Sequence, residues 1–130
     1  MRDSQSWFLE KVWHNNLAVI YMVKLIKIVK STNPLKKYDA IFLLDNGKEK
    51  IVSFGSAGFR DYILVNDKNS KWYLPKVLDR NVTKASYRRR HKKDLLTGDP
   101  RRAGYLAYYL LWNKKTLESS IKDYKKKFKL

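Results

Sequence analysis

The sequence contains no cysteine, and proline and glycine are scarce, with three and five residues among 130. Without cysteine the chain forms neither a disulfide nor a thiolate zinc site. Its longest uninterrupted apolar run, residues 17–23, is far shorter than the about 20 residues that cross a membrane. The first fourteen residues carry Arg2, Asp3, Glu10 and Lys11, so they lack the continuous apolar stretch of a secretory signal. We expect no transmembrane segment and a protein that is intracellular or assembled inside a cell.

Side chains suited to acid–base or metal chemistry are also few. The chain has two histidines, His14 and His91, and twelve scattered carboxylates. Neither histidine has the spacing of a catalytic motif, and three arginines directly precede His91. No serine lies in a nucleophile-elbow pattern, and no acidic cluster offers magnesium ligands. We therefore expect a protein that is not an enzyme and that has no catalytic residue, no metal and no cofactor.

Basic side chains are present in large excess. The chain has 29 lysines and arginines against 12 aspartates and glutamates, a formal net charge of +17. Residues 1–70 hold 11 basic and 7 acidic side chains, whereas residues 71–130 hold 18 and 5. A charge of this size predicts a polyanionic partner, because self-repulsion is otherwise unrelieved. Nucleic acid, an anionic membrane surface and an acidic protein all fit, and the second half of the chain is the half that would contact them.

The clearest local pattern is a β-hairpin over residues 38–54. Two strand-like runs flank Asn46-Gly47, and this dipeptide is the preferred centre of a two-residue type I′ turn. A two-residue turn predicts three facing pairs: Asp45 with Lys48, Phe42 with Ile51, and Ile41 with Val52. Residues 17–30 are rich in valine and isoleucine that alternate imperfectly with lysine. We expect them to add the third strand that a hairpin needs for stability.

A loop containing Gly55 and Gly58 ends the hairpin. Residues 59–65 follow, and we expect a short helix or extended piece with Phe59, Tyr62 and Ile63 facing inward. A glycine-flanked loop before a helix also suggests phosphate binding, although this spacing alone is a weak signal.

A strongly basic helix is predicted over residues 82–93, with Val82, Ala85 and Tyr87 as its buried edge. Its charges lie on more than one face of the helix, so neighbours cannot neutralise all of them. Together with the lysines near the C-terminus, they predict a surface that contacts phosphate groups without reading sequence, and the alternative is a solvated face. The predicted polyanion-binding residues are Lys84, Arg88, Arg89, Arg90, Lys92, Lys93, Lys125, Lys126 and Lys127.

Two helices are predicted after this segment. The first covers residues 98–113, with Asp99 as its cap and Pro100 in its first turn. The second begins near Thr116, and one stripe of it carries Leu117, Ile121, Tyr124 and Phe128. Two helices joined so closely should pack together. The predicted fold class is therefore α+β, with a hairpin or three-stranded sheet followed by a basic helix and a C-terminal helical pair.

Large aromatic side chains have two interpretations. Those of the helix over residues 98–113 either belong to a shared core or contact a partner. Residues 4–16 predict a short helix whose tryptophans either pack on the domain or anchor in another subunit. We divide the chain into an N-terminal arm or helix, residues 1–21, and a single domain, residues 22–130. The predicted partner-interface residues are Trp7, Trp13, Tyr108 and Trp112.

Six short segments occur in a distinctive order along the chain. They are Val52-Ser53-Phe54-Gly55, Gly58-Phe59-Arg60-Asp61-Tyr62, Tyr87-Arg88-Arg89-Arg90-His91, Asp99-Pro100, Ala103-Gly104-Tyr105 and Leu110-Leu111-Trp112-Asn113. In this order they resemble a family of small basic proteins encoded by nucleocytoplasmic large DNA viruses, including those of algae. The resemblance covers about residues 36–128. Residues 71–83 look like an insertion, the first 21 residues look additional, and Met22 is an alternative start.

The resemblance implies a virion or virus-factory protein, assembled in the host cytoplasm. In that setting we expect a minor capsid protein that bridges capsid components from inside. Its partners would be the major capsid protein or neighbouring minor proteins, and the viral DNA. The alternative is a non-specific nucleic-acid-binding or DNA-condensing protein.

Overall fold

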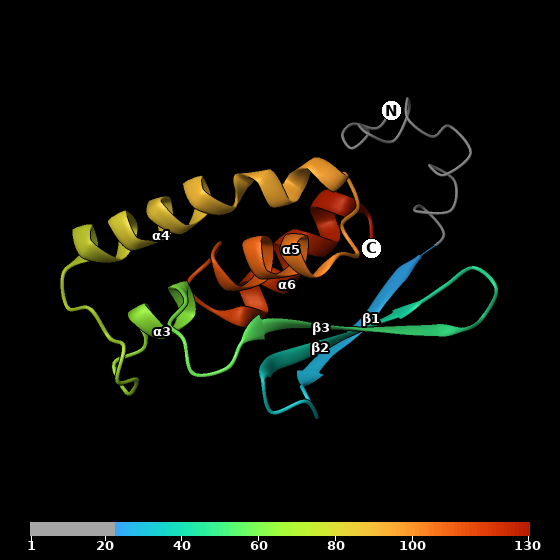
Figure 1. Ribbon diagram of the computed structural model, residues 1–130, viewed down its shortest axis with the longest axis horizontal. Coiled ribbons are helices and arrows are strands. Elements are labelled where there is room, and N and C mark those ends of the chain that lie inside the picture. The colour runs from blue at the N-terminus through green and yellow to red at the C-terminus, as the bar shows by residue number, and fades with distance from the viewer. Residues whose placement is uncertain (1–22) are drawn as a thin grey trace.

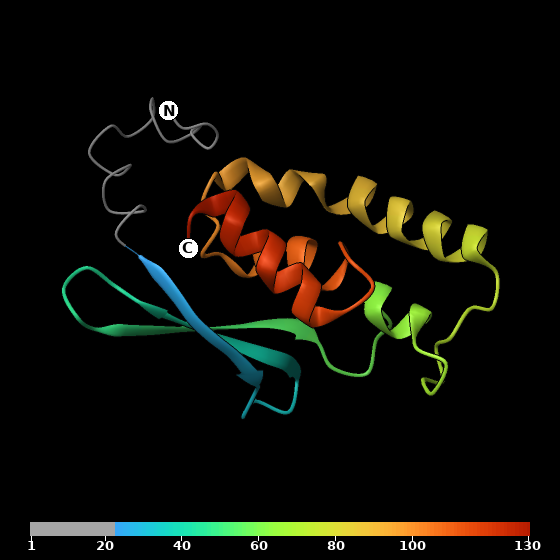
Figure 2. The same cartoon turned by 180° about the vertical axis from the view of Figure 1, so that it is seen from behind.

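The computed structural model describes residues 23–130 as two layers, a three-stranded antiparallel sheet and a group of helices on one of its faces (Figures 1 and 2). The strands lie in the order β1 (Lys24–Lys30), β2 (Lys36–Leu43) and β3 (Glu49–Ser56). The predicted α+β class, with a sheet followed by helices, is confirmed. The predicted arm, with Trp7 and Trp13, lies outside the described residues.

The helical layer begins with α3 (Tyr62–Asn66) and α4 (Val77–His91). A 3-10 helix, η1 (Lys92–Thr97), follows, and then α5 (Ala103–Leu106), which continues into a π-helical turn, η2 (Ala107–Leu111). The last helix is α6 (Leu117–Phe128). In both views α5 and α6 lie between α4 and the sheet (Figures 1 and 2). Over residues 23–130, no helix has the length and apolar character needed to cross a membrane.

The hairpin is present, but its turn has three residues rather than two. The amide of Leu44 donates to the carbonyl of Lys48 at 2.8 Å, and the amide of Gly47 donates to the carbonyl of Leu44 at 3.0 Å. Gly47 has φ +81°, whereas Asn46 has no positive φ. This geometry is a type I turn followed by a left-handed residue, the usual three-residue hairpin. The predicted type I′ turn is therefore wrong.

The extra turn residue moves the strand register by one. Ile41 lies opposite Ile51, so the predicted pairing of Ile41 with Val52 is wrong. The observed register places Phe54 opposite Tyr38, with ring centroids 5.9 Å apart, and leaves Ile51 60 % exposed. A one-residue slip turns a strand's other face to the core. Burial of Phe54 therefore decides the register.

Strand β1 supplies the expected third strand and explains its imperfect alternation. Leu25 lies opposite Phe42 and Ile28 lies opposite Ala40, with a register shift between Leu25 and Lys27. The shift is a bulge, which moves the inward positions from odd to even numbers. Residues 17–22 of the predicted strand lie outside the described part of the chain.

The predicted single helix over residues 98–113 is wrong. Gly98 is left-handed and ends η1, and the Asp99 carboxylate accepts a hydrogen bond from the Arg101 amide at 2.9 Å. The carbonyl of Pro100 accepts a hydrogen bond from the Tyr124 hydroxyl, a side chain of α6. These contacts hold residues 98–102 as a turn, so the helix begins at Ala103 instead.

Helix α4 starts earlier than predicted, and none of its residues is buried. Val82 is 58 % exposed and Ala85 is exposed, so the predicted buried edge is wrong at these two positions. The side of α4 that faces the protein carries Arg80, Lys84 and Arg88, and Tyr87 is its partly buried aromatic residue. Phe59, also predicted to face inward, is 67 % exposed.

The core lies between the sheet and the helices α5, η2 and α6. Phe42, Phe54, Leu106, Leu110 and Tyr124 are all fully buried in it. Helix α6 follows the prediction, since the Thr116 hydroxyl caps it by accepting from the Ser119 amide at 3.2 Å. Its Tyr124 and Phe128 face the core as expected.

Candidate functional site

Two of the predicted polyanion-binding residues, Lys84 and Arg88, turn toward the protein. The Lys84 ammonium donates to the carbonyl of Asn113 at 2.6 Å, and the Arg88 guanidinium donates to the carbonyl of Trp112 at 2.7 Å. These carbonyls follow η2, and carbonyls at a helix C-terminus lack internal partners and favour cations. Burial lowers the pKa of Lys84, and the nearby charges of Arg88 and Lys114 lower it further. Both side chains therefore attach α4 to the core.

The other seven predicted residues are exposed, and we call them the basic cluster. The ion pairs within residues 23–130 involve Lys37, His91, Arg101 and Arg102. None of the seven residues is therefore paired with a carboxylate of the described chain. Arg90 donates to the Ser86 hydroxyl at 2.7 Å. The basic cluster consists of Arg89, Arg90, Lys92, Lys93, Lys125, Lys126 and Lys127.

Tyr109 brings the basic ends of α4 and α6 together. The Arg88 guanidinium carbon and the Lys127 ammonium each lie 5.8 Å from the centroid of the Tyr109 ring. The last turn of α4 and the last turn of α6 both carry several positive side chains. Residues that are almost forty positions apart in the sequence therefore contribute to neighbouring parts of the surface.

Two of the four aromatic residues predicted to contact a partner, Tyr108 and Trp112, lie in the interior. Tyr108 is 7 % exposed and Trp112 is 6 % exposed. Their positions agree with the core interpretation of the aromatic stripe, while the contact with another chain stays a prediction. Tyr108 also receives the Arg88 guanidinium over its ring at 4.2 Å.

Three aromatic rings form a stack that the sequence analysis missed. The Tyr87 ring lies between those of Trp112 and His91. Its centroid is 4.3 Å from that of Trp112, with an angle of 7° between the ring planes, and 4.1 Å from that of His91, with an angle of 19°. The four-residue spacing of Tyr87 and His91 places both on one face of α4, which is a signal that the sequence does contain. Nothing in the sequence indicates that Trp112 completes the stack.

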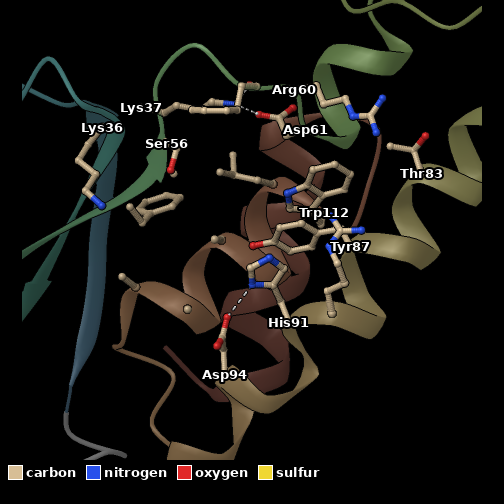
Figure 3. A pocket seen from close by; sticks show the side chains of 18 residues that line it. Lys36, Lys37, Ser56, Arg60, Asp61, Thr83, Tyr87, His91, Asp94 and Trp112 are labelled. Carbon is tan, nitrogen blue, oxygen red and sulfur yellow. Dashed lines mark hydrogen bonds and ion pairs between the residues drawn. The ribbon is translucent and has the colours of Figure 1, made fainter.

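The stack forms one wall of a pocket of about 530 Å³ between α4 and the ends of β2 and β3 (Figure 3). The opposite wall contains Lys37, whose ammonium lies 2.7 Å from the Asp61 carboxylate. Asp61 also caps α3 by accepting from the Leu64 amide at 2.8 Å. This wall is therefore fixed by an ion pair and a helix cap.

Two glycines allow close packing around this pocket. Gly55 has φ +80°, and a Cβ there would lie 2.8 Å from Leu111 Cδ1. A Cβ on Gly104 would lie 2.9 Å from the Cβ of Asp94. Side chains at these positions would push the strand end and α5 away from their neighbours, so both glycines help to set the width of the pocket.

The titratable groups on the stack wall are Tyr87, His91 and Asp94. Burial raises the pKa of Tyr87 to about 12, and the charge of Asp94 adds to this effect. The Tyr87 hydroxyl is therefore protonated at neutral pH and can donate a hydrogen bond. His91 Nδ1 lies 3.0 Å from the Asp94 carboxylate. Within residues 23–130, no three His, Cys, Asp or Glu side chains gather in a way that would hold a metal ion.

The sequence segments that carry the viral resemblance meet at this pocket. Each of them except Asp99-Pro100 contributes a lining residue. Residues 71–83, which look inserted, contribute only Thr83. The pocket lining includes Phe54, Gly55, Arg60, Asp61, Tyr87, Arg90, His91, Ala103, Gly104, Leu111 and Trp112.

Comparison with known proteins gives one match. Residues 26–72 match a family described as a family of unknown function, DUF5754. The matched region begins at Ile26 within β1, covers β2, β3 and α3, and ends before α4, so it does not include the basic cluster. No curated protein and no solved structure matches the chain.

Proposed function

We propose that this protein is a non-enzymatic structural protein that binds nucleic acid through the basic cluster. The observation that carries the proposal is the exposure of all seven basic side chains, with no carboxylate of the described residues paired to any of them. Unpaired lysines and arginines on a surface attract phosphates and release counterions when they bind them. The setting that the sequence resemblance implies is the particle of a large DNA virus.

We propose binding without sequence preference. Contacts of lysine and arginine to phosphates fix position and orientation but carry no sequence information. The two side chains of the predicted set that are held rigidly, Lys84 and Arg88, are held by the protein itself. The side chains available to nucleic acid are the exposed ones. They are better suited to contact the regularly spaced backbone phosphates than to recognise base edges.

A salt titration tests this proposal. Unrelated duplexes of equal length are titrated with the full chain at several salt concentrations. The affinities should be similar for all sequences and should decrease steeply with salt, with a slope of about −0.9 for each phosphate contacted. The triple variant Arg89→Gln, Lys92→Gln and Lys93→Gln should bind more weakly and with a shallower slope.

The matched control removes the same charge from the edge of the sheet. Lys24, Lys27 and Lys30 are exposed on β1, and their replacement by glutamine changes the net charge equally. If the control variant loses as much affinity as the cluster variant, only total charge matters and the assigned surface is wrong. A salt-independent affinity, or one strongly preferred sequence, would overturn the proposal.

A second candidate function is a minor capsid protein that bridges other capsid components from inside. The exposed apolar residues on α4 favour it, since Leu78 is 71 % exposed and Val82 is 58 % exposed, four residues apart on one side of the helix. A protein held by apolar contacts should stay with virion shells washed in about 1 M salt, where the Debye length is about 3 Å. If it leaves together with the DNA, this second candidate is wrong.

A further inference from the structure

The pocket beside α4 contains hydrogen-bond donors that the fold leaves without partners. Trp112 is 6 % exposed, and its indole N–H donates to no residue that the structure describes. The Tyr87 hydroxyl also has no hydrogen-bond partner within residues 23–130. Figure 3 shows both polar atoms turned toward the strand end at Ser56. A donor on a side chain as buried as that of Trp112 rarely lacks a partner in proteins, so an acceptor in the pocket is expected.

The charges around the pocket favour an anionic acceptor. Its lining contains Lys36, Lys37, Arg60 and Arg90 but only two carboxylates, Asp61 and Asp94.

Both carboxylates already have partners. Asp61 is held by the Lys37 ammonium and by the Leu64 amide, and Asp94 lies against His91. The positive charges of Lys36, Arg60 and Arg90 have no carboxylate partner among the described residues. An anion that enters the pocket therefore meets uncompensated positive charge.

One aromatic ring of the lining is largely exposed to solvent. Phe59 lies in the loop between β3 and α3 and is 67 % exposed. The pocket of about 530 Å³ is within the range of small-molecule sites and is much larger than a phosphate ion requires. A ligand that combines an anionic group with a planar group would use both the donors and this ring.

We propose that the pocket binds a nucleoside monophosphate. The phosphate oxygens accept hydrogen bonds from the Trp112 indole and the Tyr87 hydroxyl, while Arg60 and Arg90 balance its charge. The base stacks on the exposed ring of Phe59. This site overlaps the surface proposed for nucleic acid at one residue, Arg90.

Nuclear magnetic resonance of the full chain tests the proposal directly. The indole N–H signal of Trp112, identified by its loss in Trp112→Phe, should shift on titration with adenosine monophosphate and reach saturation. Adenosine and inorganic phosphate should each bind at least tenfold more weakly than adenosine monophosphate, because each lacks one of the two recognised groups. Equal binding of adenosine would disprove the phosphate site, and equal binding of phosphate would disprove the base site.

Variants separate this site from the basic cluster. Tyr87→Phe keeps the ring stack and removes the hydroxyl, and it should weaken adenosine monophosphate binding about tenfold or more, as expected for a hydrogen bond to a charged group. Arg90→Gln should also weaken it, whereas Arg89→Gln, an equal charge change on the neighbouring residue outside the pocket, should not. An effect of Arg89→Gln equal to that of Arg90→Gln would overturn the assignment.

The base contact has its own test. Phe59→Ala should weaken the binding of adenosine monophosphate and leave the binding of inorganic phosphate unchanged. Duplex affinity should be unchanged in Tyr87→Phe and Phe59→Ala, so failure of the pocket proposal can be distinguished from failure of the nucleic-acid proposal. Circular dichroism of each variant confirms that it folds.

Discussion

Helices α4 and α6 both end in a run of basic residues, yet they are attached to the protein in opposite ways. Helix α6 buries Ser120, Tyr124 and Phe128 along one stripe. Helix α4 is longer but buries no residue, and its inward stripe makes polar contacts through Arg80, Lys84 and Arg88. In α6 the apolar stripe holds the helix and the charges remain outside, whereas in α4 some of the charges are themselves the attachment.

This difference shows that a basic residue in this chain has one of two roles, depending on the face of the helix that carries it. Arg88 and Arg89 are adjacent in sequence, but Arg88 binds a backbone carbonyl and an aromatic ring while Arg89 is exposed. The long apolar stems of such side chains also cover surface that apolar residues would otherwise cover. The net charge of +17 therefore overstates what is available to a partner.

The largest effect should come from the buried stripe of α6. Tyr124→Ala removes a fully buried ring and should lower the free energy of unfolding by about 3–5 kcal/mol, measured by denaturant titration. Tyr124→Phe keeps the ring and removes only the hydrogen bond to Pro100, so it should cost about 1–2 kcal/mol. If both variants are as stable as the wild type, α6 is not held by this stripe.

The next effect should come from the polar attachment of α4. Arg88→Met keeps most of the side-chain volume but removes the hydrogen bond to Trp112 and the cation over Tyr108, and it should cost about 1.5–3 kcal/mol. Arg89→Met is the matched control, and as an exposed substitution it should change stability by no more than about 0.5 kcal/mol. Equal effects of the two variants would show that α4 is not attached through Arg88.

Alkaline pH should weaken the helical layer. Burial raises the pKa of Tyr87 and of Tyr105 to about 12, whereas an unfolded tyrosine titrates near pH 10. Above pH 10 the native chain binds more protons than the unfolded chain. The stabilisation that these two protonated tyrosines contribute to the folded state is therefore complete below about pH 10 and is lost as the pH rises toward 12. Denaturation midpoints measured across this range should decrease.

Single tyrosine variants sharpen the comparison of the two helices at alkaline pH. Burial raises the pKa of Tyr124 on α6 well above its ordinary value, and Tyr124 is fully buried, whereas Tyr87 on α4 is only partly buried. Tyr124→Phe should therefore flatten the alkaline decrease more than Tyr87→Phe does. The reverse order would contradict the attachment that we assign to α6.

The smallest effect on the isolated protein should come from the outer face of α4. The double variant Leu78→Ser and Val82→Ser changes two exposed side chains and should shift the free energy of unfolding by about 0.5 kcal/mol or less. A loss of several kcal/mol, measured by the same titration, would show that this face is covered within the chain. Loss of incorporation into virions, with stability unchanged, would support the capsid candidate.

The parts of the fold that the sequence predicts correctly depend on local patterns. Helix α6 has its cap at Thr116 and its apolar residues at helical spacing, so both its start and its buried face can be predicted. The hairpin follows from Asn46-Gly47 between two strand-like runs. Its register does not, because a two-residue and a three-residue turn use the same dipeptide, and burial of Phe54 selects between them.

The remaining features depend on contacts between distant residues. The break before α5 involves Tyr124 and Pro100, which are 24 residues apart. Attachment of α4 links Lys84 to Asn113, 29 residues away. The pocket requires residues from the sheet end, α4 and η2 to converge. The segments that carry the family resemblance contain many of these residues, but nothing in the sequence indicates that they form one site. Helical periodicity alone cannot distinguish the cation that binds a carbonyl from its exposed neighbour.

The attachment of α4 to the carbonyls of Trp112 and Asn113 also has a consequence for the order in which the protein folds during synthesis. The three strands pair with sequence neighbours through short loops, so they can associate early. Helix α4 has no buried stripe of its own and depends on carbonyls at residues 112 and 113. The segment that presents those carbonyls is held in turn by α6, because the Asn113 side-chain amide donates to the Asp123 carboxylate at 2.8 Å and the Lys114 amide donates to the Ser120 hydroxyl at 3.0 Å. Until the last turn of α6 has left the ribosome, α4 should remain undocked, with its arginines free to bind any polyanion nearby.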